Sequence, residues 1–95
     1  MPTKILVIIF ILLKGFSTVS QATDLELGIY ELNRGEFHTA IEIFRPLVIK
    51  GYAPAQYQMG LIYLNGYGVI KDAKKALELF NLAAAQNYPD ALFDL

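Results

Sequence analysis

Residues 53–88 read APAQYQMGLIYLNGYGVIKDAKKALELFNLAAAQNY, and this stretch decides the fold. Its apolar residues recur three and four positions apart, as on the buried face of an α-helix, so we expect helices at 55–65 and 73–86. Pro54 suits the first turn of the first helix, and Asp72 can cap the second. The stretch therefore predicts a helical hairpin with a glycine-containing loop between its arms.

A similar pattern recurs along the chain at a distance of 36 residues. This shift pairs Ala40 with Ala76, Ile41 with Leu77, Phe44 with Phe80, Gly51 with Asn87, and Ala55 with Ala91. A shift of 32 aligns an earlier helix with the third one and places Leu27-Gly28 on Met59-Gly60. We therefore expect two further helices at 24–33 and 37–50, and a fifth that begins near residue 89.

Small residues at matching positions indicate that these helices pack closely. Gly28 and Gly60 fall inside predicted helices, where glycine costs about 1 kcal/mol relative to alanine, and we expect the backbone of another helix against them. Such a hairpin cannot bury its apolar face alone, so hairpins stack. The sequence predicts an all-α chain of helical-hairpin repeats, an α–α superhelix with units at 23–52 and 53–88 and the start of a third at 89–95.

Local signals mark the ends of the helices. Thr23 and Glu26 have the spacing of a capping box, which predicts the start of the first helix. Gly51 and Gly66 follow predicted helices and can end them in a left-handed conformation. Pro46 does not suit this pattern, because inside a helix it removes one backbone hydrogen bond at a cost of about 3 kcal/mol or introduces a kink.

The second hairpin resembles the Sel-one-like (Sel1-like) repeat, a subfamily of the tetratricopeptide-like helical repeats. The positions that carry the resemblance are Ala55, Met59-Gly60, Tyr63, Gly66-Tyr67-Gly68-Val69, Asp72, Ala76, Phe80 and Ala83-Ala84. Met59 replaces the usual Leu and Asn87 the usual late Gly, while the first hairpin looks more like a plain tetratricopeptide unit. The resemblance implies a solenoid that acts as an adaptor for protein–protein contacts, and many members are exported bacterial proteins.

The first segment, 1–22, has the layout of a secretory signal peptide. Lys4 precedes the apolar run ILVIIFILL at 5–13, and the small residues Ser20 and Ala22 stand where a signal peptidase reads. We expect cleavage after Ala22 and a secreted or periplasmic protein. The alternative is a membrane anchor, but a spanning helix needs about 20 apolar residues. We therefore expect no stable membrane insertion after cleavage.

The composition of the remaining chain excludes several functions. Without the leader, six basic and nine acidic side chains leave a net charge of −3, which argues against nucleic acid as a partner. The chain has no Cys, and its only serines, Ser17 and Ser20, belong to the leader, so a Ser- or Cys-type catalytic triad cannot be assembled. His38 and Glu42 are too few ligands for a structural zinc site. We expect no enzyme, no cofactor and no metal.

The resemblance also implies that the first helix of each hairpin lines a concave groove. In the second hairpin, Tyr57, Leu61 and Leu64 form an apolar stripe that ends beside Asn65, and Asn33 ends the corresponding helix of the first hairpin. We expect these five residues to bind an extended or helical peptide.

Packing between neighbouring hairpins is the alternative role for these positions. It is favoured for Leu25, Ile29 and Leu61, because adjacent repeats bury a continuous face. Tyr57 and the two asparagines are better binding candidates, because their polar tips gain from a polar partner.

The chain stops at Leu95, the position equivalent to Met59. We expect a truncated repeat array; the alternative is homo-association, or docking of another partner, through an open C-terminal end. The function predicted overall is an exported protein–protein interaction scaffold with no catalysis of its own. The alternative is an accessory recruiting factor for an enzyme that acts on a cell-envelope polymer.

Overall fold

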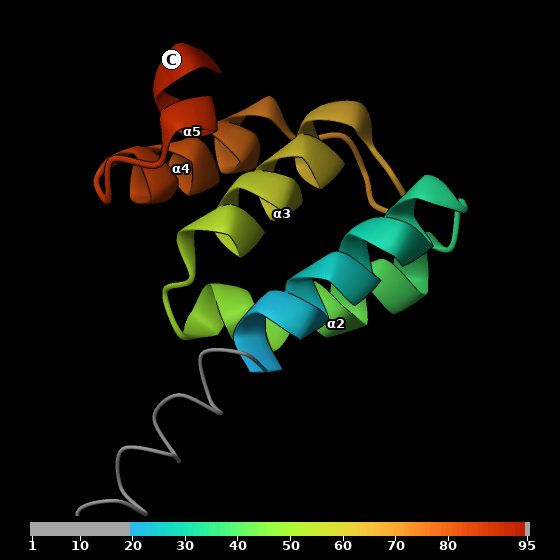
Figure 1. Ribbon diagram of the computed structural model, residues 1–95. Helices are drawn as coiled ribbons and strands as arrows, with labels where there is room; N and C mark the ends of the chain where they lie inside the picture. The colour runs from blue at the N-terminus through green and yellow to red at the C-terminus, as the bar shows by residue number, and fades with distance from the viewer. Residues whose placement is uncertain (1–19, 95) are drawn as a thin grey trace, which may run out of the picture.

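The computed structural model describes residues 20–94, which form helices connected by short loops (Figure 1). A first helix occupies residues 20–33 and is followed by α2 (Phe37–Ile49), α3 (Ala53–Asn65), α4 (Ala73–Ala84) and α5 (Pro89–Asp94). No strand occurs in this part of the chain, so the all-α prediction is confirmed. Over the same residues, every helix is too short or too polar to cross a membrane. The predicted leader lies almost entirely outside the described residues.

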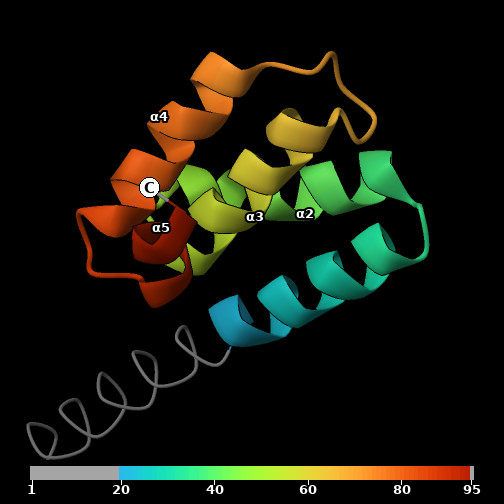
Figure 2. The same cartoon turned by 90° about the horizontal axis from the view of Figure 1, so that it is seen from above.

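The first helix and α2 form one hairpin, and α3 and α4 form the next (Figure 2). The first helix is already formed at residue 20, so Thr23 lies inside it. The prediction that Thr23 caps this helix is therefore wrong, because the residues before it continue the helical hydrogen bonding that a cap would replace. The tight turn that follows the helix contains Gly35 with φ +82°, a left-handed conformation.

A phenylalanine ring lies against each of the two helical glycines. A Cβ at Gly28 would overlap the ring of Phe44, and a Cβ at Gly60 would lie 2.5 Å from Cε1 of Phe80. The glycines do permit close packing, as expected, but the group against them is a ring of the same hairpin and not a helix backbone. Each hairpin is thus closed by an aromatic side chain that occupies the space of a missing methyl group.

The helix α3 lies between α2 and α4 and joins the two hairpins into one core. The main cluster of buried side chains comes from both hairpins: Ala40, Ile41, Phe44, Leu47, Ala55, Met59, Ile62 and Leu79. The side of α3 that faces this cluster carries Ala55 and Ile62, which are fully buried, and Met59, which is nearly so. Leu25 and Ile29 pack against this cluster, which confirms packing as their role.

The ends of the helices follow the local signals. Gly66 ends α3 at φ +70°, and the Asp72 carboxylate accepts a hydrogen bond of 3.0 Å from the backbone N–H of Lys75 at the start of α4. Gly51 has φ +83°, and Asn87 has φ +61°. Asn tolerates the left-handed region better than most residues. This explains why Asn87 can replace the usual glycine after α4.

Pro46 does not end α2. The helix continues to Ile49 with Pro46 exposed on its surface. The missing hydrogen bond therefore falls on the solvent side, where water can satisfy the carbonyl that loses its donor.

A smaller cluster holds α5 in place. Ala53, Ala83 and Ala91 are buried together, and the half-buried rings of Tyr57 and Tyr88 pack against them. Beside this cluster, the Gln86 amide donates hydrogen bonds of 2.9 Å to the backbone carbonyl of Gly51 and to the side chain of buried Gln56. The end of α4 is thereby fixed to the turn between α2 and α3.

Candidate functional site

The five residues predicted to bind a peptide lie on two adjoining surfaces that share Leu61. Asn33, Leu61 and Asn65 line one, which we call the amide pocket. Tyr57, Leu61 and Leu64 line the other, which we call the apolar face. The single groove expected from the sequence is thus divided, because α3 turns two different sides toward its surroundings.

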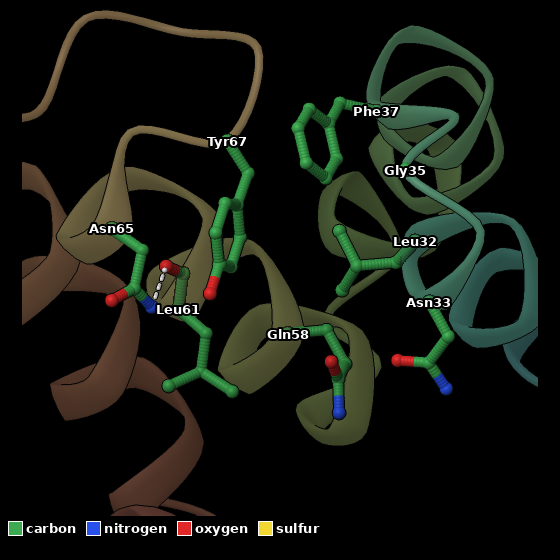
Figure 3. Close-up of a pocket in the computed structure, with 8 residues that line it drawn as sticks. All are labelled: Leu32, Asn33, Gly35, Phe37, Gln58, Leu61, Asn65 and Tyr67. Carbon is green, nitrogen blue, oxygen red and sulfur yellow. Dashed lines mark hydrogen bonds between the residues drawn. The ribbon is translucent and has the colours of Figure 1, made fainter.

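The amide pocket lies where the loop ends of the two hairpins meet (Figure 3). It has a volume of about 460 Å³, within the range of roughly 300–1,000 Å³ usual for ligand pockets. Its lining residues come from the end of the first helix, the start of α2, α3 and the loop after α3: Leu32, Asn33, Gly35, Phe37, Gln58, Leu61, Asn65 and Tyr67. Stacked hairpins point the same way, so their loops come together at one end.

Three amide side chains supply polar groups to this pocket, beside the hydroxyl group of Tyr67. Asn33 is exposed, Gln58 is half-buried, and Figure 3 shows both reaching the same edge of the pocket. Asn65 lies at another edge and donates a hydrogen bond of 2.9 Å from Nδ2 to the backbone carbonyl of Leu61. Part of the Asn65 amide therefore completes the last turn of α3, which leaves Asn33 and Gln58 as the groups more available to a ligand.

An aromatic pair forms one wall of the amide pocket. The rings of Phe37 and Tyr67 are stacked with centroids 5.1 Å apart and an interplanar angle of 21°. Gly68 makes this contact feasible, because a Cβ there would lie 2.7 Å from Cβ of Phe37. The G-x-G loop therefore brings the second hairpin against the first, in addition to ending α3.

The apolar face lies within the second hairpin, between α3 and α4, and has a volume of about 530 Å³. Aliphatic and aromatic side chains dominate its lining: Tyr57, Leu61, Leu64, Ala73, Ala76, Leu77 and Phe80. The ring of Tyr57 is tilted against those of Phe80 and Tyr88, with centroids 5.5 and 5.6 Å away. Aromatic contacts of this kind fix the Tyr57 side chain at the edge of the face.

Sequence reasoning missed several residues of both surfaces. Gln58 could have been found, because it precedes Leu61 by three and Asn65 by seven residues and so shares their side of α3. Phe37 and Tyr67 could not be paired from the sequence alone, since Phe37 begins α2 in the first hairpin and Tyr67 lies in the loop of the second. Their contact depends on how the hairpins stack.

Charged groups lie outside both surfaces. The ammonium group of Lys75 lies 4.8 Å from the centroid of the Tyr63 ring, while Lys71 and Lys74 are exposed. His38 is exposed near the start of α2. Among residues 20–94, no group of three His, Cys, Asp or Glu side chains is placed to hold a metal ion.

Tyr88 has a phenol whose pKa departs from its ordinary value. Burial raises the pKa of its phenol above the ordinary value, and the negative charge of Asp90 raises it further. The amide pocket and the apolar face thus consist of amide, aliphatic and aromatic groups. Such groups can hydrogen-bond a peptide and bury its apolar side chains.

Comparison with known proteins agrees with this architecture. The family model of the Sel1 repeat matches residues 53–88, the hairpin of α3 and α4. The chitin synthase regulator SKT5 of Malassezia restricta is 34% identical over 71 residues, which is 74% of the chain but 5% of that relative. The chain therefore spans only a small part of this much longer protein. No solved structure was found to match the chain. With its hairpins, loop glycines and buried alanines at the repeat positions, the chain is a helical, tetratricopeptide-like protein that carries a Sel1 repeat at residues 53–88.

Proposed function

We propose that the chain is an exported scaffold that binds extended peptide segments of other proteins in its amide pocket. Sel1 repeats mediate protein–protein contacts, which is the general role expected of the second hairpin. The observation that carries the more specific proposal is that Asn33 and Gln58, from different hairpins, line the same pocket as the side chains of Leu32 and Leu61.

The chemistry of amide side chains suits a peptide main chain. An Asn or Gln side chain offers both a donor and an acceptor, as each peptide unit does, so the two can pair in both directions. Asn33 and Gln58 can therefore hold an extended backbone whatever its sequence. Leu32, Leu61 and the Phe37–Tyr67 pair can then select a segment with an apolar side chain directed into the pocket.

Selection of peptides from a displayed random library tests this proposal. We expect the wild-type chain to enrich sequences with a recurring apolar residue, and the double variant Asn33→Ala/Gln58→Ala to bind them at least tenfold more weakly. Asn81→Ala is the matched control, because Asn81 is an exposed amide on α4 outside both surfaces. Equal affinity of the double variant and wild type would contradict the proposal.

Export is the second part of the proposal. The apolar run at 5–13 and the small residues before position 23 support it. Cleavage after Ala22 would leave the first helix to begin at Thr23. Mass spectrometry of the protein recovered from outside the cytoplasm of its host should give a chain that starts at Thr23. Recovery of an uncut chain only from the cytoplasm would contradict export.

A recruiting role for an envelope enzyme is the other candidate. The relative named above is a regulator of chitin synthase, an enzyme that makes a structural polysaccharide. If the chain has a similar role, the immobilised protein should retain polysaccharide-synthesising activity from an envelope extract. Retention should fall with the Asn33→Ala/Gln58→Ala variant, whereas equal retention by a denatured chain would show that the capture is non-specific.

A further inference from the structure

A contact inside the molecule shows how an apolar face of this type is covered. Between the two hairpins, α3 places Ala55, Met59 and Ile62 against the first hairpin, where their exposed fractions are 0%, 6% and 0%. The covered surface comes from the first helix and α2, and includes Ile41 with an exposed fraction of 7%. This contact is a helix with apolar residues at positions i, i+4 and i+7, seated on a helical hairpin.

The apolar face is the corresponding helix-binding surface of the second hairpin, and we call this surface the seat. Shifts of 32 and 36 residues map its lining onto Leu25, Ile29, Leu32, Phe37, Ala40, Ile41 and Phe44 of the first hairpin. In the second hairpin, however, Leu77 is 51% exposed, against 7% for its counterpart Ile41. The helix α5 covers one end of this seat, around Ala53 and Ala83, and leaves the rest open.

The first helix carries exposed side chains at the positions equivalent to those of α3 that insert into the first hairpin. By the shift of 32 residues, Leu27 corresponds to Met59 and Tyr30 to Ile62. These two are exposed, at 48% and 58%, whereas Met59 and Ile62 are buried. Within residues 20–94, the second hairpin thus presents an open seat, and the first helix presents the kind of apolar side chains that fill such a seat.

We propose that copies of this chain associate head to tail, with the first helix of one copy seated on the apolar face of the next. Charge favours the same pairing. The first helix carries three acidic residues, of which Glu31 is paired with Arg34 just after the helix, while residues 71–75, beside the apolar face, carry three lysines and one aspartate. Opposite charges on facing surfaces speed encounter and fix orientation.

The helix α5 must shift for this contact to form. By the repeat alignment, its six residues occupy the place of residues 21–26 of the incoming helix. An isolated helix of six residues is unstable in water, so its contacts are readily exchanged for those of a longer helix. The contact joins different surfaces of the two copies, and such heterologous contacts extend into open chains or rings.

Two variants of the full chain, each with one side of the contact blocked, test the proposal. Both are expressed with the leader so that any processing occurs. Leu27→Asp removes the inserting side chain, and Leu77→Asp places a charge in the seat. Both residues are exposed, so folding should persist and can be checked by circular dichroism. Leu82→Asp is the matched control, because Leu82 is 53% exposed on α4 but outside the apolar face.

Sedimentation velocity over a wide concentration range gives the readout. We expect wild type and Leu82→Asp to form concentration-dependent oligomers, and each blocked variant alone to be monomeric or to need at least tenfold more protein. A mixture of the two blocked variants should stop at one-to-one dimers, because one intact first helix and one intact seat remain. A monomeric wild type, oligomers of either blocked variant at wild-type concentrations, or a mixture that stays monomeric would overturn the proposal. These variants leave Asn33 and Gln58 intact, so failure here would not touch peptide binding.

Discussion

Gly28 and Gly60 show at the residue scale why this chain needs glycine inside its helices. Each lies beneath a phenylalanine ring of its own hairpin, in a space too small for a Cβ atom. The sequence revealed that something lies close to these glycines, since glycine inside a helix is costly. It could not reveal that the neighbour is an aromatic ring, because that depends on the rotation of α2 and α4 about their axes.

Gly60→Ala should therefore destabilise the protein although alanine is the better helix former. Overpacking costs about 1–3 kcal/mol, while the gain in helix propensity is about 1 kcal/mol. We expect a net loss of up to about 2 kcal/mol in the free energy of unfolding, measured by chemical denaturation. In a double-mutant cycle, Phe80→Leu should relieve part of this loss; strict additivity of the two changes would contradict the contact.

Tyr88 links stability to alkaline pH. Burial, and then the charge of Asp90, raise the pKa of its phenol in the folded state above the value of about 10 in the unfolded chain. The resulting stabilisation is complete below about pH 10 and is lost as the pH rises through the folded-state pKa. Unfolding midpoints measured across this range should fall less steeply for Tyr88→Phe than for wild type. Identical slopes would show that Tyr88 makes no contribution.

Pro46 is the clearest test at the scale of a helix. Its ring is exposed in the last turns of α2, and its position in the second hairpin is taken by Leu82 within an unbroken α4. Pro46→Ala restores one backbone hydrogen-bond donor, which stabilises the interior of a helix by about 3 kcal/mol. It also increases the conformational entropy of the unfolded chain, which lowers the free energy of unfolding by about 1 kcal/mol. Thermal unfolding should show a gain of about 2 kcal/mol. A loss of stability would mean that α2 depends on the fixed backbone of Pro46.

The helices themselves were largely predictable, because their apolar spacing is strong and their ends carry specific residues. Asp72 and Gly66 mark the loop between α3 and α4 as predicted, and α3 begins with Pro54 in its first turn. Thr23 misled the prediction, since a capping box is a local signal that a longer helix can override. The end of α4 was placed two residues late, at 86 instead of Ala84, which is within the usual uncertainty of helix boundaries.

At the scale of the whole molecule, the predicted binding residues separated into two surfaces. Tyr57 and Leu64 share a stripe with Leu61 along α3, and one-dimensional spacing cannot tell which neighbouring helix each one faces. The repeat itself resolves this, because the first-hairpin counterparts of the stripe pack against the core cluster. The amide pocket, in contrast, exists only because two loops from separate hairpins come together.

Nuclear magnetic resonance of the isotope-labelled chain, titrated with a peptide selected on it, tests most directly whether the amide pocket holds a peptide. We predict that the side-chain amide signals of Asn33 and Gln58 shift first and saturate together, with backbone signals of Phe37 and Tyr67 following the same curve. The side-chain signal of Asn81 should not move. Saturable shifts confined to α4 and α5, with Asn33 and Gln58 unchanged, would contradict peptide binding in this pocket.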